Sequence, residues 1–280
     1  MKFKKNIAFL FGILAFISYF SLRNLPESEV EVMKVDTNNY CTIYLKKQNL
    51  LVPMSIPNTS KDVQSFVQLY IDYLCGHKKV KIASAFDCDK VKLENASLKD
   101  NCLTLQFNSA LLELKQEDEL SFLQSLMKMM TQIKGVESFK LQVHNQTLTQ
   151  LRHGTLIPES IHTNMGMNSL VNQANFLHQS EPFIVYRLLK EEGKTYYVPI
   201  ELRLPKALST KEKLNYIVSS ATYHTKLQSP FKENDAITCD DTSIHLKMKT
   251  LENDPSLRET IINIISLSLK ENVLDKVIIK

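Results

Sequence analysis

Apolar and polar positions follow the same order in two parts of the chain. Each part contains two short runs of β-forming residues joined by a polar turn, which predicts a β-hairpin. The second run of each pair contains Val-Pro, and Val198-Pro199 lies 146 positions after Val52-Pro53. The runs are CTIYLKK (41–47) and NLLVPMSI (49–56) in the first part, and FIVYRLL (183–189) and TYYVPIEL (195–202) in the second.

A helical pattern follows each hairpin. Thr59 and Asp62 have the spacing of a capping box, and Ser209 and Glu212 repeat it. Apolar residues then recur at helical spacing, which predicts a helix with one buried face. These residues are Val63, Phe66, Val67, Tyr70, Ile71 and Leu74 in the first part, and Leu214, Ile217, Val218 and Ala221 in the second.

Each part closes with an alternating strand, a second helix and a last strand. Equivalent residues are offset by 141 positions in the first of these elements and by 138 in the other two. An offset that changes only between elements is what loop insertions and deletions produce, so the chain contains two copies of one unit. In the second copy, Asp254-Pro255 supplies an N-cap and an N1 proline to the helix. The matching residues are Leu103, Leu105 and Phe107, then Leu123, Leu126, Met127, Met130 and Ile133, then Phe139, Leu141 and Val143 in the first copy, and Ile244, Leu246 and Met248, then Ile261, Ile264 and Ile265, then Val277 and Ile279 in the second.

The order of elements predicts an α+β fold made of two repeated small domains. Each unit reads β-β-α-β-α-β, and its two helices are long enough to cover one face of a small mixed sheet. The length of 280 residues agrees with two domains at about 150 residues per domain. We predict a first domain over 40–165, a linker over 166–181 and a second domain over 182–280.

The first residues carry a targeting pattern. Three lysines precede an uncharged, mostly apolar run over 7–22, which as a helix spans about 24 Å against a hydrocarbon core of about 30 Å. Bulky residues leave no clear cleavage site, and no cysteine follows for lipid attachment. We predict an uncleaved signal anchor over 1–23 and a membrane-proximal spacer over 24–39, with the body outside the cytoplasm at the cell membrane. A cleaved signal peptide and a buried core helix are the competing interpretations.

The charge of the body is balanced. The chain has 34 basic and 30 acidic residues, and its net charge of +4 is equal to the contribution of Lys2, Lys4, Lys5 and Arg23. Nucleic-acid binding needs clustered, uncompensated Lys and Arg. We therefore expect no nucleic-acid partner.

The sequence contains no recognised catalytic motif. Its six glycines form neither a Walker loop nor GxGxxG, and GxSxG and HExxH are absent. Four histidines near the linker are separated by 9, 9 and 16 residues, which suits no compact metal site. Two acidic pairs have a simpler interpretation as solvated turn residues. We predict no catalytic, cofactor-binding or metal-ligating residues and no cofactor; the candidates set aside are His144, His153, His162 and His178, and the pairs Asp87 with Asp89 and Asp240 with Asp241.

Five cysteines lie in the body, and an odd number leaves at least one unpaired. A disulfide between Cys88 and Cys102 is one alternative. Buried thiols are the interpretation that we favour, because cysteine often packs as a small hydrophobe.

Several of these segments resemble the GerMN domain of sporulation and spore germination proteins. The resemblance rests on IYL, LVPM, a helix ending in YLCG, the later helix and strands, and the tail NQTLTQLRHGTLIPESI, and it covers about residues 40–280 in two copies. It implies a fold similar to ring-building motifs. It also implies an exported, membrane-tethered, non-enzymatic protein of endospore-forming bacteria, acting as a structural or assembly component of a complex that spans the two membranes between mother cell and forespore. Familiar members are often lipoproteins, so the missing lipid-attachment cysteine is a departure.

The expected partners follow from this resemblance. They are other proteins of a sporulation envelope complex, further copies of the chain in an oligomeric ring, and the membrane through residues 7–22. The alternative function is an extracytoplasmic binding module for cell-wall glycan or peptide. In that case Tyr186, Tyr196 and Tyr197 stack on sugars between the copies, although alternation in a strand explains them equally well.

Overall fold

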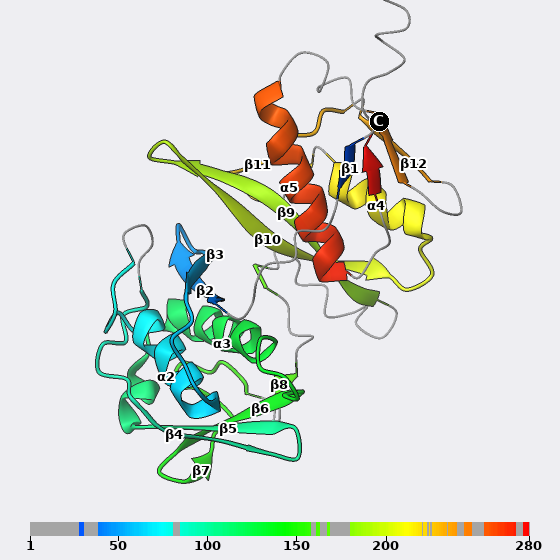
Figure 1. Ribbon diagram of the computed structural model, residues 1–280. Helices are drawn as coiled ribbons and strands as arrows, with labels where there is room; N and C mark the ends of the chain where they lie inside the picture. The colour runs from blue at the N-terminus through cyan, green and yellow to red at the C-terminus, as the bar shows by residue number, and fades with distance from the viewer. Residues whose placement is uncertain are drawn as a thin grey trace, which may run out of the picture.

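Two α+β domains lie in separate halves of Figure 1. The predicted signal anchor lies outside the described residues, as do most of the predicted linker and Asp254. None of the described helices has the length and apolar character needed to cross a bilayer. The computed structural model describes residues 28–30, 39–80, 85–157, 161–162, 167–168, 180–219, 221–222, 224, 226–233, 235–239, 244–247, 255–272 and 277–279.

The first domain contains a hairpin, two α-helices and a sheet. The sheet has the order β4-β5-β6-β7, and β8 also pairs with β6. Strands β5 and β6 are parallel, so helix α3 between them makes the crossover that a parallel pair requires. The elements are β2 (Tyr40–Lys47), β3 (Leu50–Pro57), α2 (Val63–Leu74), β4 (Leu93–Lys99), β5 (Cys102–Phe107), the 3-10 helix η1 (Ser109–Glu113), α3 (Gln116–Met130), β6 (Ser138–Val143), β7 (Gln146–Thr147) and β8 (Ile161–His162).

The second domain repeats this arrangement with two sheets, ordered β10-β9-β11 and β1-β14-β13-β12. Strands β13 and β14 are parallel and are joined through α5. Strand β1 lies within the predicted spacer and pairs with β14, beside the C-terminus in Figure 1. The elements are β1 (Ser28–Val30), β9 (Ser180–Glu191), β10 (Lys194–Pro205), α4 (Thr210–Val218), β11 (Leu227–Gln228), β12 (Ala236–Cys239), β13 (Ile244–Lys247), α5 (Pro255–Asn272) and β14 (Val277–Ile279).

Both predicted hairpins are present, and both close through two residues in the left-handed region. Gln48 and Asn49 have φ of 49° and 65°, and Glu192 and Gly193 have 50° and 73°. Positive φ at both central positions is the mark of a type I′ turn, whose twist matches that of the flanking strands. The two copies therefore share a turn geometry as well as a hydrophobic pattern.

The predicted capping box at the start of α2 is wrong by three residues. Asp62 is the N-cap: its carboxylate accepts the Ser65 N–H (2.7 Å), and the Ser65 hydroxyl accepts the Asp62 N–H (3.1 Å). Thr59 lies outside the helix because Asn58 holds this segment in a turn, accepting the Ser60 N–H through its side-chain oxygen (3.1 Å). The predicted box of Ser209 and Glu212 in the second copy is confirmed.

The predicted apolar positions form the cores of the two domains. Those with described side chains are buried, apart from half-buried Val63 and Ile133 and exposed Ala221. Ile133 and Ala221 lie beyond the ends of α3 and α4. Strand β4 was not predicted, because only Leu93 of its seven residues is buried and an exposed edge strand has no apolar alternation to detect.

Candidate functional site

The outer edge of β2 is closed by side chains instead of a third strand. The Gln132 amide, just after α3, accepts the Thr42 N–H and donates to the Thr42 carbonyl, both at 2.7 Å. The Tyr44 N–H donates to the Tyr70 hydroxyl (3.2 Å), and the Ser125 hydroxyl donates to the Tyr44 carbonyl (2.8 Å). An unpaired strand edge can template assembly, so these bonds block strand addition along this part of β2.

The second domain closes β9 in the same way. The Asn272 amide, at the end of α5, accepts the Ile184 N–H (2.9 Å) and donates to the Ile184 carbonyl (2.7 Å). The Tyr186 N–H donates to the Ser268 hydroxyl (3.1 Å). Polar side chains in or just after α3 and α5 therefore close the edge of the hairpin in both copies.

The repeated prolines fit this geometry. Pro53 pairs with Tyr44 and Pro199 pairs with Tyr186, two residues whose backbone N–H groups point away from the hairpin. A residue opposite such a position donates no hydrogen bond to the ladder, so a proline is accommodated there. Because proline has no N–H, the edge of β3 or β10 that faces away from the hairpin also has one hydrogen-bond donor fewer.

The two copies meet through the strands that carry the repeat. Strand β3 of the first domain contacts β10 of the second, where the two domains face each other in Figure 1. Leu50 and Val52 belong to the hydrophobic core of the second domain, where they join Val198 and Ile200. The repeated Val-Pro segments therefore lie in the strands at which the two copies pack on each other.

Asn168 joins the two strands through one side chain. Its amide accepts the Leu51 N–H (2.8 Å) and donates to the carbonyls of Leu51 (2.8 Å) and Pro199 (2.9 Å). Its φ of 50° is tolerated well by asparagine. The preceding residue, Met167, packs in the first core and accepts the Glu201 N–H (3.0 Å). This short segment thus binds β3 and β10 at once.

Charged groups surround this apolar contact. At the hairpin tips, Lys47 lies 2.8 Å from the Glu191 carboxylate and 5.0 Å from the centre of the Tyr196 ring. The hydrogen bond from Lys47 lowers the pKa of Glu191. Beyond it, the Glu271 carboxylate accepts from Lys128 (3.3 Å) and from the Tyr186 hydroxyl (3.0 Å).

A groove of about 680 Å³ opens at the end of this junction. The start of β2, the start of α2, the end of α3 and the last turn of α5 line it, so both domains contribute. We call it the junction groove. Tyr40 on its rim is 52% exposed, while Tyr44 and Phe66 are buried at its base.

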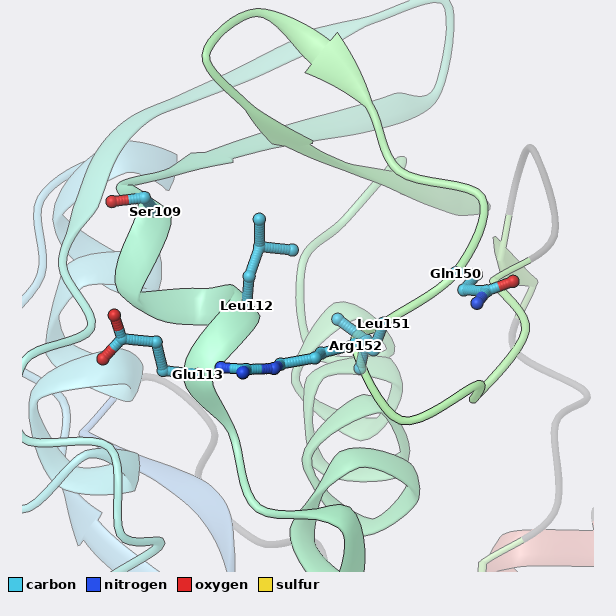
Figure 2. A pocket seen from close by; sticks show the side chains of 6 residues that line it. All are labelled: Ser109, Leu112, Glu113, Gln150, Leu151 and Arg152. Carbon is cyan, nitrogen blue, oxygen red and sulfur yellow. The ribbon is translucent and has the colours of Figure 1, made fainter.

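A second, shallower pocket of about 550 Å³ lies on the first domain between η1 and the segment 150–152. Figure 2 shows Arg152 extending toward the helix that carries Leu112 and Glu113. Ser109 and Glu113 both line this pocket, but no hydrogen bond joins their side chains in the described part of the chain, so the pocket shows no nucleophile activated by a base.

The buried Glu119 fixes the backbone beside this pocket. Its carboxylate accepts the N–H groups of His153 (2.8 Å) and Thr155 (3.3 Å). Burial raises the pKa of Glu119, but the hydrogen bonds with Thr155 and His153 outweigh it and hold the pKa below its usual value. Such a group stabilises the fold above its unfolded pKa, and this contribution is lost as pH falls through the folded pKa.

Replacing Glu119 with glutamine should therefore cost about 1–2 kcal/mol of unfolding free energy at neutral pH, since one backbone N–H loses a charged acceptor. The difference from the wild type should shrink in acid. Urea unfolding followed by circular dichroism at neutral and acidic pH measures both values. Glu117→Gln, at an exposed position in the same helix turn, is the control; an equal loss at both pH values would contradict this assignment.

Among the described residues, the candidates set aside in the sequence form no metal-binding group. Asp87 forms an exposed ion pair with Lys115 (2.6 Å). His178, Asp240 and Asp241 lie outside the described residues. No cluster of three His, Cys, Asp or Glu side chains occurs within the described part of the chain.

The cysteines with described side chains are free. Cys41, Cys75 and Cys88 are buried, in agreement with the buried-thiol interpretation, and Cys102 is half-buried. Cys88 contacts Cys75, and this contact together with burial raises the pKa of the Cys88 thiol. No disulfide joins Cys88 to Cys102.

Comparison with known proteins agrees with this architecture. No family model matches the chain. The spore germination protein GerM of Bacillus subtilis (strain 168) is 29% identical over 107 residues, which are 38% of this chain and 29% of GerM. The tandem GerMN domains of the sporulation protein GerM from Bacillus subtilis have a TM-score of 0.68 at 20% identity, over 86% of this chain and 90% of that chain. The chain therefore resembles GerM in sequence over 107 residues and has the fold of its tandem GerMN domains.

The resemblance to the GerMN family drawn from the sequence is therefore confirmed. The first GerMN domain of GerM, taken alone, has a TM-score of 0.38 at 20% identity, over 44% of this chain and 96% of that chain.

The residues that join the two copies were not singled out in the sequence. Asn168 lies in a linker that also contains Asn172 and Asn175, and no spacing rule distinguishes it from them. Gln132 lies just after α3 and Asn272 is the last residue of the equivalent helix α5, 140 positions later, so a search for repeated polar residues at helix ends could have found them.

Proposed function

We propose that this chain acts in sporulation or spore germination as a non-enzymatic, membrane-anchored assembly component of an envelope complex between mother cell and forespore. The observation that carries the proposal is the tandem GerMN architecture, which this chain shares with the sporulation protein GerM over 86% of its length. The identity of 29% to a spore germination protein supports the same process.

The construction of the junction favours assembly over catalysis. The repeat is used to hold two domains together, and the described pockets present no nucleophile paired with a base. A paired unit of this kind offers the surfaces that ring-building domains use, since head-to-tail contacts close into rings when the rotation permits. The membrane anchor over 1–23 is part of the proposal.

Deletion of the gene, with the intact chain restored as control, tests this function through the yield of heat-resistant spores. We expect a large fall in yield that the intact chain rescues. An unchanged yield, with normal germination of the spores formed, would overturn the proposal.

Binding of cell-wall glycan is the second candidate, and the exposed Tyr40 beside the junction groove favours it. In the structure Tyr186 is buried and hydrogen-bonded to Glu271, so it does not offer a stacking face. Retention of the full chain on purified peptidoglycan, weakened by Tyr40→Ala, would support this candidate over assembly alone.

A further inference from the structure

The junction groove carries an excess of positive charge. Lys61, Lys134 and Lys270 line it with exposed side chains, and no ion pair of the described residues includes them. These lysines come from three segments of two domains: Lys61 just before α2, Lys134 shortly after α3, and Lys270 in the last turn of α5. Their convergence therefore depends on the junction and not on any local run of sequence.

The two acidic residues of the groove, Asp62 and Glu271, already accept hydrogen bonds from other groups of the protein. Asp62 caps α2 through the Ser65 N–H (2.7 Å), which lowers the pKa of its carboxyl. Glu271 accepts from both Lys128 and the Tyr186 hydroxyl. Neither carboxylate forms an ion pair with Lys61, Lys134 or Lys270, and the groove is lined by four lysines, Lys128 included, against two carboxylates, so it attracts an anionic ligand.

The groove also contains a segment of strand edge. Thr42 and Tyr44 direct their backbone groups away from β3, and by the alternation of an antiparallel pair Tyr40 does the same. Pro57, which lies opposite Tyr40, donates nothing to it. Gln132 closes the edge at Thr42, whereas no side chain of the described residues binds the Tyr40 backbone.

We propose that the junction groove binds an acidic, extended peptide segment of a partner protein. The segment's backbone pairs with the edge of β2 at Tyr40, and its carboxylates contact Lys61, Lys134 and Lys270. A backbone edge recognises a peptide and not a phosphate polymer, which is why we assign a protein ligand. The inference rests on the proposed assembly function and names the chemistry of one partner.

Binding of a fluorescein-labelled peptide of alternating glutamate and valine to the full chain in detergent tests this site by fluorescence anisotropy. The triple variant Lys61→Gln, Lys134→Gln and Lys270→Gln should bind about tenfold more weakly, since three exposed ion pairs are lost. The matched control is Lys90→Gln, Lys99→Gln and Lys206→Gln, which changes three exposed lysines outside the groove and should bind like the wild type. Added salt should weaken wild-type binding.

Tyr40→Pro tests the strand edge separately. Proline removes the N–H that the peptide uses but is accepted at the first position of a strand. It should weaken binding severalfold beyond Tyr40→Phe, which keeps the backbone donor. Circular dichroism checks that each variant is folded.

Three results would overturn the site: no binding of the acidic peptide, equal weakening by the groove and control variants, or displacement by polyphosphate with no effect of Tyr40→Pro. The last result would assign the groove to an anionic polymer instead. The peptide assay reads the groove alone and the spore assay reads the function, so the failure of one is distinguishable from the failure of the other.

Discussion

Replacing Arg187 with methionine is expected to lower the free energy of unfolding by about 3 kcal/mol, because buried carbonyl groups lose a charged donor. Arg187 lies in β9 and is only 2% exposed. Its guanidinium donates to the carbonyls of Tyr216 (2.9 Å) and Ile217 (3.2 Å) at the end of α4, and to that of Tyr186 (3.0 Å). It thus satisfies helix carbonyls that have no intrahelical partner.

Urea unfolding of the full chain, followed by circular dichroism, measures this loss. Arg187→Lys keeps the charge but not the planar fork of donors, so it should fall between the wild type and the methionine variant. Lys190→Met, at an exposed position of the same strand, is the matched control and should change stability little. A methionine variant as stable as the wild type would show that the guanidinium does not hold α4.

The second large effect is expected from Asn168→Asp. Aspartate keeps the acceptor for the Leu51 N–H but loses both donated bonds, and its charge faces the carbonyls of Leu51 and Pro199. We expect a loss of about 2–3 kcal/mol, concentrated at the contact of β3 with β10.

Hydrogen exchange read by mass spectrometry locates this loss. Peptides from both β3 and β10 should exchange faster in the variant, while those from β5 and β6 should not. Asn168→Gly removes the amide without adding charge, and glycine tolerates the positive φ, so it should give a smaller effect at the same strands. Faster exchange throughout the chain would contradict a local role.

Much of the fold could be predicted because its periodic elements are strongly patterned. The Val-Pro hairpins, the helix capped by Ser209 and the inner residues of β5 and β6 occupy their predicted positions. The start of α2 was misplaced because two overlapping polar pairs, Thr59 with Asp62 and Asp62 with Ser65, both resemble caps. The local sequence does not determine which of the two pairs caps the N-terminus of the helix.

The site was beyond sequence reasoning for a different reason. The junction groove combines Lys61, Lys134 and Lys270, and these lysines converge only once β3 has packed against β10. The pattern showed that Leu50 and Val52 are apolar. It did not show that they enter the core of the other copy.

Coupled unfolding of the two domains tests most directly the claim that the repeat joins them into one unit. The chain has no tryptophan, so Tyr73→Trp in α2 and Tyr216→Trp in α4 each place a single fluorescent probe in one domain. We predict coincident urea midpoints for the two probes, and midpoints that separate when Asn168→Asp is added. Separate midpoints in the presence of Asn168 would contradict the account, since the copies would then be independent domains on a linker.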